Sequence, residues 1–128
     1  MELQEHMQDL VGIVRTESEM MRALEILADL RQRTARIGVG GNREYNNGWH
    51  TALDLPNLLT VSEAVTRAGL ERRESRGAHF REDYPEKVSL FGQFNIVVRK
   101  GREGEMIITR QPIPEMPPEL KRVVEENK

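Results

Sequence analysis

The chain contains no cysteine among its 128 residues. This absence excludes disulfide bonds, thiolate zinc sites, iron–sulfur clusters ligated by this chain and a cysteine nucleophile. Aromatic residues are also scarce, with one Trp, two Tyr and three Phe. A core must therefore be built mainly from aliphatic side chains, a composition that favours packed helices. Any electron relay is expected to belong to a partner.

Long apolar runs and a strong charge of one sign are also missing. The longest apolar runs, such as Ile-Val-Val at residues 96–98, fall far short of the ~20 residues that a membrane-spanning helix needs. The start Met1-Glu2 does not resemble a signal peptide. A net charge of −2 supplies no basic field for phosphates, so nucleic acid is not an expected partner. We expect one soluble domain without direct membrane insertion.

Two helices are predicted in the first 37 residues. Apolar residues recur at intervals of three and four residues, which places them on one face of a first helix: Leu3, Met7, Leu10 and Val14. Thr16 and Glu19 have the spacing of a capping box, so a second helix should begin there and continue through Leu30. The sequence Gly-Val-Gly-Gly-Asn at residues 38–42 should end it.

A third helix is predicted after a loop at residues 42–50, in which Trp49 is the expected apolar anchor. Asp54 can cap this helix, and Pro56 is tolerated in a first turn. The expected core stripe consists of Leu55, Leu58, Val61, Val65 and Ala68. Gly77 should mark the end of the helix.

The pattern then changes to β structure. Residues 94–99 and 106–109 are β-prone and flank a short glycine-containing loop, which predicts a hairpin. Four prolines between residues 112 and 118 predict an extended segment, and residues 119–126 a short last helix. The fold class expected is mainly α, with a helical bundle at 1–87 and a hairpin and proline-rich tail at 88–128 in the same domain.

No cofactor or metal site is predicted. The glycines of residues 38–41 follow a helix and precede a loop, whereas a dinucleotide-binding turn needs a strand before it and a helix after it. The histidines, His6, His50 and His79, are far apart in sequence and lack the i, i+4 spacing of a metal site. A structural hydrogen-bonding role is the expectation for His50 and His79.

Residues 72–85 form the most unusual stretch, because positive and negative charges nearly balance in it. From physics alone the default interpretation is a solvated surface, since exposed pairs contribute little. The alternative is a buried network in which guanidinium groups bridge carboxylates and carbonyls across a domain boundary. Glu74, Glu82 and Asp83 argue against an RNA-binding surface.

This stretch also carries a family resemblance. Residues 74–79, Glu-Ser-Arg-Gly-Ala-His, followed by Arg-Glu-Asp-Tyr-Pro at 81–85, closely resemble the signature near the C-terminus of succinate dehydrogenase and fumarate reductase flavoproteins. The helix at 53–68, the loop at 45–50 and the tail are similar to those of the dehydrogenase branch. L-aspartate oxidase and adenylylsulfate reductase carry similar C-terminal bundles, and the loop and tail favour succinate dehydrogenase over them.

The resemblance implies a three-helix, spectrin-repeat-like bundle with a C-terminal β-hairpin, following the residues that hold the flavin and the dicarboxylate. It implies FAD in the parent protein but none in this chain, and no catalytic residue here. The implied partners are the flavin-binding domain of the same subunit and an iron–sulfur subunit. The implied location is the cytoplasm, or the cytoplasmic face of a membrane through partner subunits.

The resemblance and the pattern together give eight interface or structural candidates: Trp49, His50, Arg76, His79, Arg81, Glu82, Asp83 and Tyr84. Those in the charged stretch are expected to hold the bundle against the flavin-binding domain or the iron–sulfur partner. Two alternatives stay open: the C-terminal domain of a related flavoprotein such as L-aspartate oxidase, and a stand-alone helical protein-interaction module.

Overall fold

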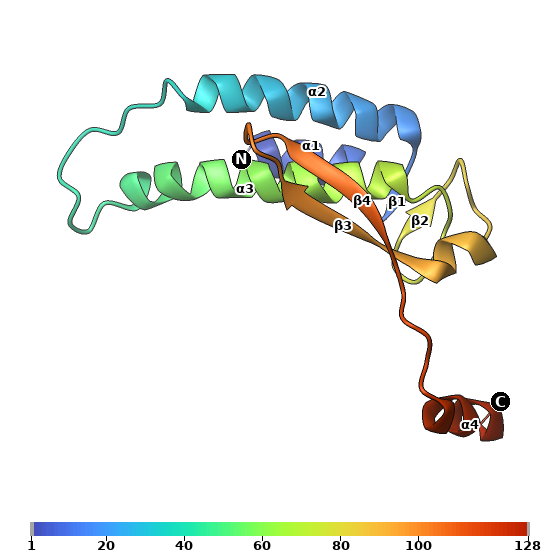
Figure 1. Ribbon diagram of the computed structural model, residues 1–128. Helices are drawn as coiled ribbons and strands as arrows, with labels where there is room; N and C mark the ends of the chain where they lie inside the picture. The colour runs from blue at the N-terminus through green and yellow to red at the C-terminus, as the bar shows by residue number, and fades with distance from the viewer. Residues whose placement is uncertain (1, 128) are drawn as a thin grey trace.

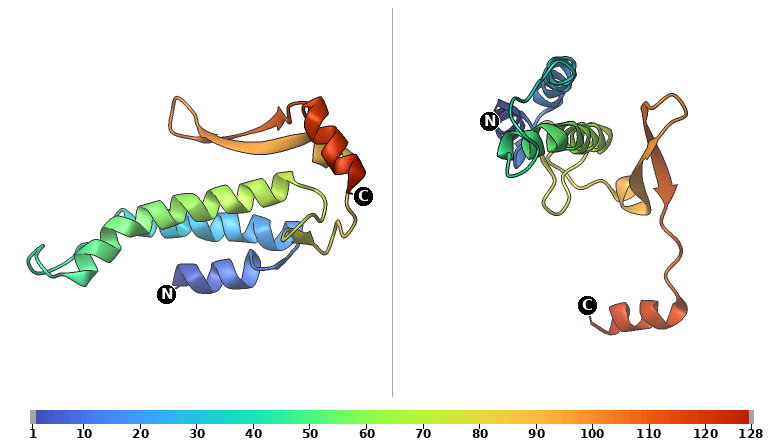
Figure 2. Two further views of the ribbon diagram at one scale, coloured as in Figure 1. Left: turned by 90° about the horizontal axis from the view of Figure 1, so that it is seen from below. Right: turned by 90° about the vertical axis from the view of Figure 1, so that its left-hand side faces the viewer.

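The computed structural model describes residues 2–127 and is mainly α (Figure 1). Its helices are α1 (Glu2–Leu10), α2 (Glu17–Thr34), α3 (Asn47–Glu71) and α4 (Pro118–Glu126), with a 3₁₀ turn η1 (Ser89–Gln93). Its strands are β1 (Val14–Arg15), β2 (Phe80–Arg81), β3 (Phe94–Lys100) and β4 (Met106–Pro112). Helices α1, α2 and α3 lie side by side, and the β3–β4 hairpin lies along α3 (Figures 1 and 2).

The start of α2 shows one of the two hydrogen bonds of the predicted capping box, and the Glu19 carboxylate accepts from the Thr16 hydroxyl instead of from a backbone amide. Thr16 is the N-cap residue, and the Glu19 amide donates to its hydroxyl oxygen over 3.3 Å. The Thr16 hydroxyl lies 2.7 Å from a Glu19 carboxylate oxygen, to which it donates. Helix α2 ends at Thr34, ahead of the glycine-rich stretch, as expected of a helix stop.

Helix α3 begins earlier than predicted. Asn46, and not Asp54, caps it, because the Asn46 side-chain oxygen accepts from the Trp49 amide over 3.2 Å. The prediction of a loop through His50 is therefore wrong, and Pro56 stands inside the helix instead of in its first turn. Pro56 is exposed, so the carbonyl that lacks its usual amide donor can bond to water.

The core comprises two clusters between the helices. Leu3, Leu27, Leu30 and Leu59 form one, and Val11, Met20 and Ala23 the other. The stripe predicted for α3 is partly wrong, since Leu58, Val61 and Val65 are 43%, 62% and 42% exposed. The buried face of α3 instead runs through Leu59, Thr66 and Gly69.

The first helix is also shorter than predicted. Helix α1 ends at Leu10, and Val14 lies in β1, where it is 52% exposed. Strand β1 pairs in parallel with β2, and Val14 faces Phe80 in that register. The pairing joins residues 14–15 to the charged stretch 66 residues later. The unequal lengths of α1, α2 and α3, at 9, 18 and 25 residues, leave the spectrin-repeat likeness a prediction.

The predicted hairpin and last helix are both present. Strands β3 and β4 are antiparallel, with Val97 opposite Thr109. The Arg110 Nε donates to a Glu71 carboxylate oxygen over 2.7 Å, which ties the hairpin to the end of α3. An extended segment then leads to α4, which lies apart from the rest of the molecule (Figures 1 and 2). None of the helices within residues 2–127 has the length and apolarity required to cross a membrane.

Candidate functional site

The charged stretch folds into a tight turn directly after α3. The amide of Arg76 donates to the His79 carbonyl over 2.8 Å, and the His79 amide donates back over 3.0 Å. Gly77 lies inside this turn with φ of +58°, a left-handed conformation that favours glycine. The prediction that Gly77 ends the third helix is wrong, because α3 ends at Glu71 and the glycine is used to reverse the chain.

Glu74 is the centre of one ion cluster and is fully buried. Its carboxylate accepts from Arg76 Nε over 2.6 Å, from Arg72 Nη1 over 2.8 Å and from the Val88 amide over 2.8 Å. Hydrogen bonding to Arg76, supported by the Val88 amide and Arg72, lowers the pKa of Glu74 to about 2 despite its burial. The Glu74 carboxylate therefore joins α3 to the segment that leads into η1.

Arg81 is the centre of a second cluster and is also fully buried. Its Nε and Nη2 donate to the two carboxylate oxygens of Asp83, each over 2.7 Å. Its Nη1 donates over 3.0 Å to the carbonyl of Gly69 in α3. The guanidinium carbon lies 4.9 Å from the centre of the Tyr84 ring, within range of a cation–π contact.

Asp83 extends this cluster to the start of α2. Besides the Arg81 pair, its carboxylate accepts from the Glu17 amide over 3.0 Å. Arg81 is the main cause that lowers the pKa of Asp83 to about 2, and the Glu17 amide adds to it. A carboxylate at the first amides of a helix is favourable to the helix dipole. The pair thus secures the beginning of α2 against the end of α3.

His79 lies between the two clusters and is partly buried. Its Nδ1 is 3.1 Å from Arg15 Nη1, and its Nε2 is 3.1 Å from the Arg72 carbonyl oxygen. An arginine can only donate and a carbonyl can only accept, so Nδ1 accepts and the proton sits on Nε2. Burial is the main cause that lowers the pKa of His79, and the charges of Arg15, Arg81 and Arg72 add to it. The ring is held neutral.

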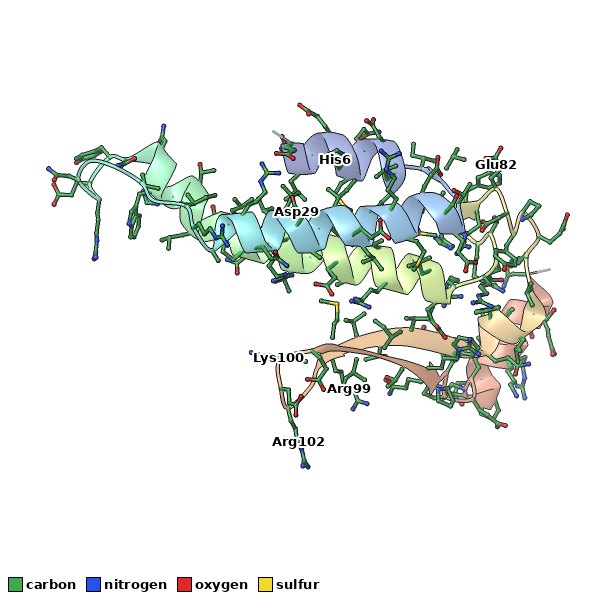
Figure 3. The ribbon with its side chains drawn as sticks, turned by 90° about the horizontal axis from the view of Figure 1, so that it is seen from above. His6, Asp29, Glu82, Arg99, Lys100 and Arg102 are labelled. Atoms are coloured by element: carbon green, nitrogen blue, oxygen red, sulfur yellow. The ribbon has the colours of Figure 1, made fainter. Side chains whose placement is uncertain are left out.

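Of the eight predicted residues, the structure brings together Arg76, His79, Arg81, Asp83 and Tyr84. Glu74 and Arg81 overturn the interpretation of this stretch as a solvated surface, because both are fully buried. Glu82 is exposed and lies at the end of the molecule where α2 begins (Figure 3).

Trp49 and His50 are not part of these clusters. They lie in the first turn of α3, at the opposite end of that helix from residues 72–84 (Figure 1). Their rings meet edge to face with centres 5.4 Å apart, and Arg43 lies 5.7 Å from the centre of the Trp49 ring. These contacts therefore belong to the start of α3 and the loop that precedes it.

Sequence reasoning missed four partners of the clusters. These are Arg15, Arg72, Glu74 and Ser75. The Ser75 hydroxyl oxygen accepts from the Arg81 amide over 2.9 Å and its proton is directed to the Tyr84 carbonyl at 2.9 Å. Arg72, Glu74 and Ser75 stand in the charged stretch, so their membership could have been suspected. Arg15 lies 64 residues from His79 and gave no such signal.

The arrangement is suited to holding elements together. Within residues 2–127, every buried side-chain nitrogen and oxygen has a hydrogen-bond partner. No group of three or more His, Asp or Glu side chains in that range could hold a metal ion. The glycines of residues 38–41 connect α2 to α3 with no strand before them, so they do not fit a flavin-binding turn.

The fold and the two ion clusters define a helical domain in which the ion pairs hold the helices and the charged turn together. The family model described as fumarate reductase flavoprotein C-term matches residues 1–122. The chain belongs to this family, the C-terminal domains of succinate dehydrogenase and fumarate reductase flavoprotein subunits.

Individual relatives agree with this membership. The succinate dehydrogenase flavoprotein subunit of Coxiella burnetii is 39% identical over 67% of this chain and 15% of its own. L-aspartate oxidase of Vibrio cholerae is 34% identical over 77% of this chain and 18% of its own. Among solved structures, Mycobacterium smegmatis Sdh1 in complex with UQ1 has a TM-score of 0.90 and 40% identity over 98% of this chain and 22% of the matched one. The chain thus spans about a sixth to a fifth of these proteins.

Proposed function

We propose that this chain is the C-terminal domain of a succinate dehydrogenase flavoprotein subunit and acts as a support and docking element. In the parent protein the remaining part would bind FAD, oxidise succinate to fumarate by transferring a hydride to the flavin, and pass electrons to an iron–sulfur subunit. The observation that carries this proposal is the match to the Mycobacterium smegmatis Sdh1 chain across 98% of this chain and only 22% of that one.

The division of labour follows from where the charges lie. Arg81, Asp83 and Glu74 form their ion pairs inside this domain, so their role is to hold α2, α3 and the turn in a fixed arrangement. Such an arrangement would hold the flavin and the electron acceptor in register, since rate depends on the geometry of reacting groups.

The docking surface would consist of exposed side chains that take no part in the two ion clusters. Leu58, Val61 and Val65 form an exposed apolar stripe on α3, and apolar patches of this kind mark interaction sites. At the two ends of α3, the exposed His50 and Glu82 are polar candidates for the rim of such an interface. The flavin-binding domain of the same subunit and the iron–sulfur subunit are the proposed partners, which would place the domain in the cytoplasm or at the cytoplasmic face of a membrane.

A second candidate is the C-terminal domain of an L-aspartate oxidase. It is favoured by relatives such as the Vibrio cholerae enzyme at 34% identity. The succinate dehydrogenase assignment is preferred because the match to the Sdh1 structure combines 40% identity with 98% coverage of this chain. The sequence matches do not separate the two candidates, since the Coxiella burnetii dehydrogenase subunit covers 67% of this chain and the Vibrio cholerae oxidase 77%.

Complementation tests the proposal. The matched Mycobacterium smegmatis chain would be shortened before its C-terminal domain, purified with its flavin and mixed with the complete 128-residue chain. The chain alone should be colourless and inactive. The mixture should bind and regain succinate-dependent dye reduction that the shortened protein lacks or performs slowly.

The outcome separates the candidates. Recovery of L-aspartate oxidation with an equally shortened oxidase, and not of succinate oxidation, would favour the second candidate. Recovery of neither, with no binding to either flavoprotein, would leave a stand-alone interaction module. A yellow 128-residue chain with stoichiometric flavin, or one that reduces dye with succinate unaided, would refute the proposal.

A further inference from the structure

Asn47 and Gly48 form the only Asn-Gly sequence in the chain. The other asparagines are followed by residues that carry a side chain. The backbone nitrogen that follows an asparagine can attack the carbonyl carbon of the asparagine side chain, and glycine places no Cβ in the way of that attack. The sequence therefore singles out Asn47 among the asparagines of this chain as a reactive side chain.

The structure leaves both reacting groups of this pair uncovered. Asn47 and Gly48 are exposed at the start of α3, at the end of the molecule where the α2–α3 loop projects (Figure 1). Within residues 2–127 the Asn47 side chain has no hydrogen-bond partner. The Gly48 amide is one of the first four amides of α3, and these have no carbonyl partner inside the helix. The nitrogen and the side-chain carbonyl are therefore both free to react.

The side chain of Asn46, directly before this pair, is held in place. Its Nδ2 donates to the Gly40 carbonyl over 3.0 Å and to the Asn42 carbonyl over 2.9 Å. Its Oδ1 accepts from the Trp49 amide over 3.2 Å. Attack on the Asn46 side chain would break all three bonds, so the same loop contains a protected asparagine beside an unprotected one.

The attack needs a brief opening of the first turn of α3, because a helical backbone does not direct the Gly48 nitrogen at the Asn47 side chain. The Thr51 hydroxyl donates to the Asn47 carbonyl over 2.9 Å and keeps this turn closed most of the time. Tyr45 favours opening, since its φ of +54° is costly for a residue with a side chain and its fully exposed ring gains no packing in return. Neither core cluster includes a residue of this turn, so it can open while the rest of the domain stays folded.

We propose that Asn47 is a site of spontaneous deamidation, an inference independent of the proposed function. The Gly48 nitrogen forms a bond to Cγ of Asn47, the bond from Cγ to Nδ2 breaks, and the Gly48 amide proton leaves with Nδ2 as ammonia. The product is a cyclic succinimide. Water opens this ring and gives aspartate when the bond to Cγ is cut, or isoaspartate when the bond to the main-chain carbon is cut. The reaction consumes one water, releases one ammonia and needs no oxidant or cofactor.

The two products affect α3 differently. Aspartate leaves the backbone unchanged and adds a negative charge in the first turn, which the helix dipole favours. Isoaspartate routes the main chain through the side chain, and so inserts a methylene group between the Asn46 cap and the Trp49 amide that donates to it. The cap is lost, and with it the edge-to-face contact of Trp49 with His50. Residues 72–84, at the other end of α3, keep their ion pairs.

The test follows the complete chain during incubation in mildly alkaline buffer. Fragmentation mass spectrometry locates the deamidated residue, and a carboxyl methyltransferase specific for isoaspartate identifies that product. We expect deamidation at Asn47, mostly as isoaspartate, and none at Asn46 or Asn57 over the same period. Gly48→Ala should slow the reaction by at least about tenfold, because the added Cβ blocks the approach. Gly40→Ala, in the same loop and with open space around an added Cβ, should react within about twofold of the unaltered chain.

The fluorescence of Trp49 provides the second readout. The purified isoaspartate form should show altered emission because Trp49 loses its neighbours, whereas Asn47→Asp, which is identical to the other product, should match the unaltered chain. The inference would be overturned by equal rates at Asn46 and Asn47, by an equal rate in Gly48→Ala, or by a reaction that occurs only in the urea-unfolded chain. An isoaspartate form with the emission of the unaltered chain would contradict the loss of the cap.

Discussion

Arg81 and Asp83 form a two-point ion pair in which Nε and Nη2 donate to the two carboxylate oxygens, each over 2.7 Å. Only one residue separates them in sequence, yet the pair connects distant elements. Arg81 also donates to the Gly69 carbonyl at the end of α3, and Asp83 accepts from the Glu17 amide at the start of α2. The pair is therefore a joint between α2, α3 and the charged turn.

Replacing Arg81 should be strongly destabilising. Arg81→Met removes the donor that serves the Asp83 carboxylate and the Gly69 carbonyl. Removing one partner of a fully buried pair costs about 3–5 kcal/mol, and the loss here should lie toward or below the lower end of that range, because the Asp83 side chain is 28% exposed and keeps the Glu17 amide as a donor. Arg81→Lys keeps the charge but not the two-point geometry, so it should lie in between. Arg73 is exposed, so Arg73→Met should change stability by less than about 0.5 kcal/mol. Urea unfolding measures all three, and equal stabilities for Arg81→Met and Arg73→Met would contradict the role of the pair.

Stability should fall in acid between about pH 4.5 and pH 2. The pKa values of Glu74 and Asp83 are lowered to about 2 in the folded chain from ordinary values of 4.5 and 3.8. The unfolded chain therefore takes up protons first as pH falls, and the stabilisation present above pH 4.5 is lost through this window. Urea unfolding from pH 7 to pH 2.5 measures this loss. The Glu74→Gln variant should be less stable than the unaltered chain at pH 7, and its free energy of unfolding should fall less as the pH is lowered. The exposed neighbour change Glu82→Gln should leave the acid profile as it is.

The titration of His79 should add a second pH dependence of the stability, at higher pH than that of the two carboxylates. Its pKa is lowered from 6.5, mainly by burial, so the unfolded chain binds the proton more readily than the folded one. The stabilisation is full above pH 6.5 and declines as pH falls toward the lowered pKa. Protonation would also direct Nδ1–H against Arg15. Unfolding midpoints from pH 8 to pH 5 should decline in the unaltered chain and less so in His79→Gln. His50→Gln, at an exposed histidine, should decline like the unaltered chain.

Gly77 should tolerate few replacements. Its φ of +58° is left-handed, while the space around its Cβ position is open, so the cost of a side chain comes from the backbone alone. Gly77→Ala should lose about 1–2 kcal/mol, and Gly77→Asn less, because asparagine visits this region more readily. Gly40→Ala, where the φ is not positive and no atom lies within 4 Å of an added Cβ, is the control. An equal loss at both glycines in urea unfolding would exclude the backbone explanation.

Local signals predicted most of the elements. The Thr16 cap and the β-prone residues around 97 and 109 each act over a few residues, and the structure contains α2 and the hairpin accordingly. Errors arose where two local signals competed. Asn46 and Asp54 are both of residue types that cap helices. The structure uses Asn46, so Pro56 falls inside α3.

The buried face of α3 could not be read from spacing. Leu55, Leu58 and Leu59 offer two overlapping stripes, and a helical period does not distinguish them. Packing against α1 and α2 selects Leu59 and leaves Leu58 exposed. The same limit applies to Arg15, whose bond to His79 depends on the pairing of β1 with β2.

The sequence by itself determined the helical character, the hairpin and, through the residues at 74–85, the family. Caps, periodicity and turn residues act between neighbours in the chain, so they are visible without a structure. Only the tertiary structure decided that Glu74 and Arg81 are buried and that the ion pairs hold this domain together. Burial and charge pairing depend on residues that are distant in sequence, and the fold alone brings those residues within hydrogen-bonding distance.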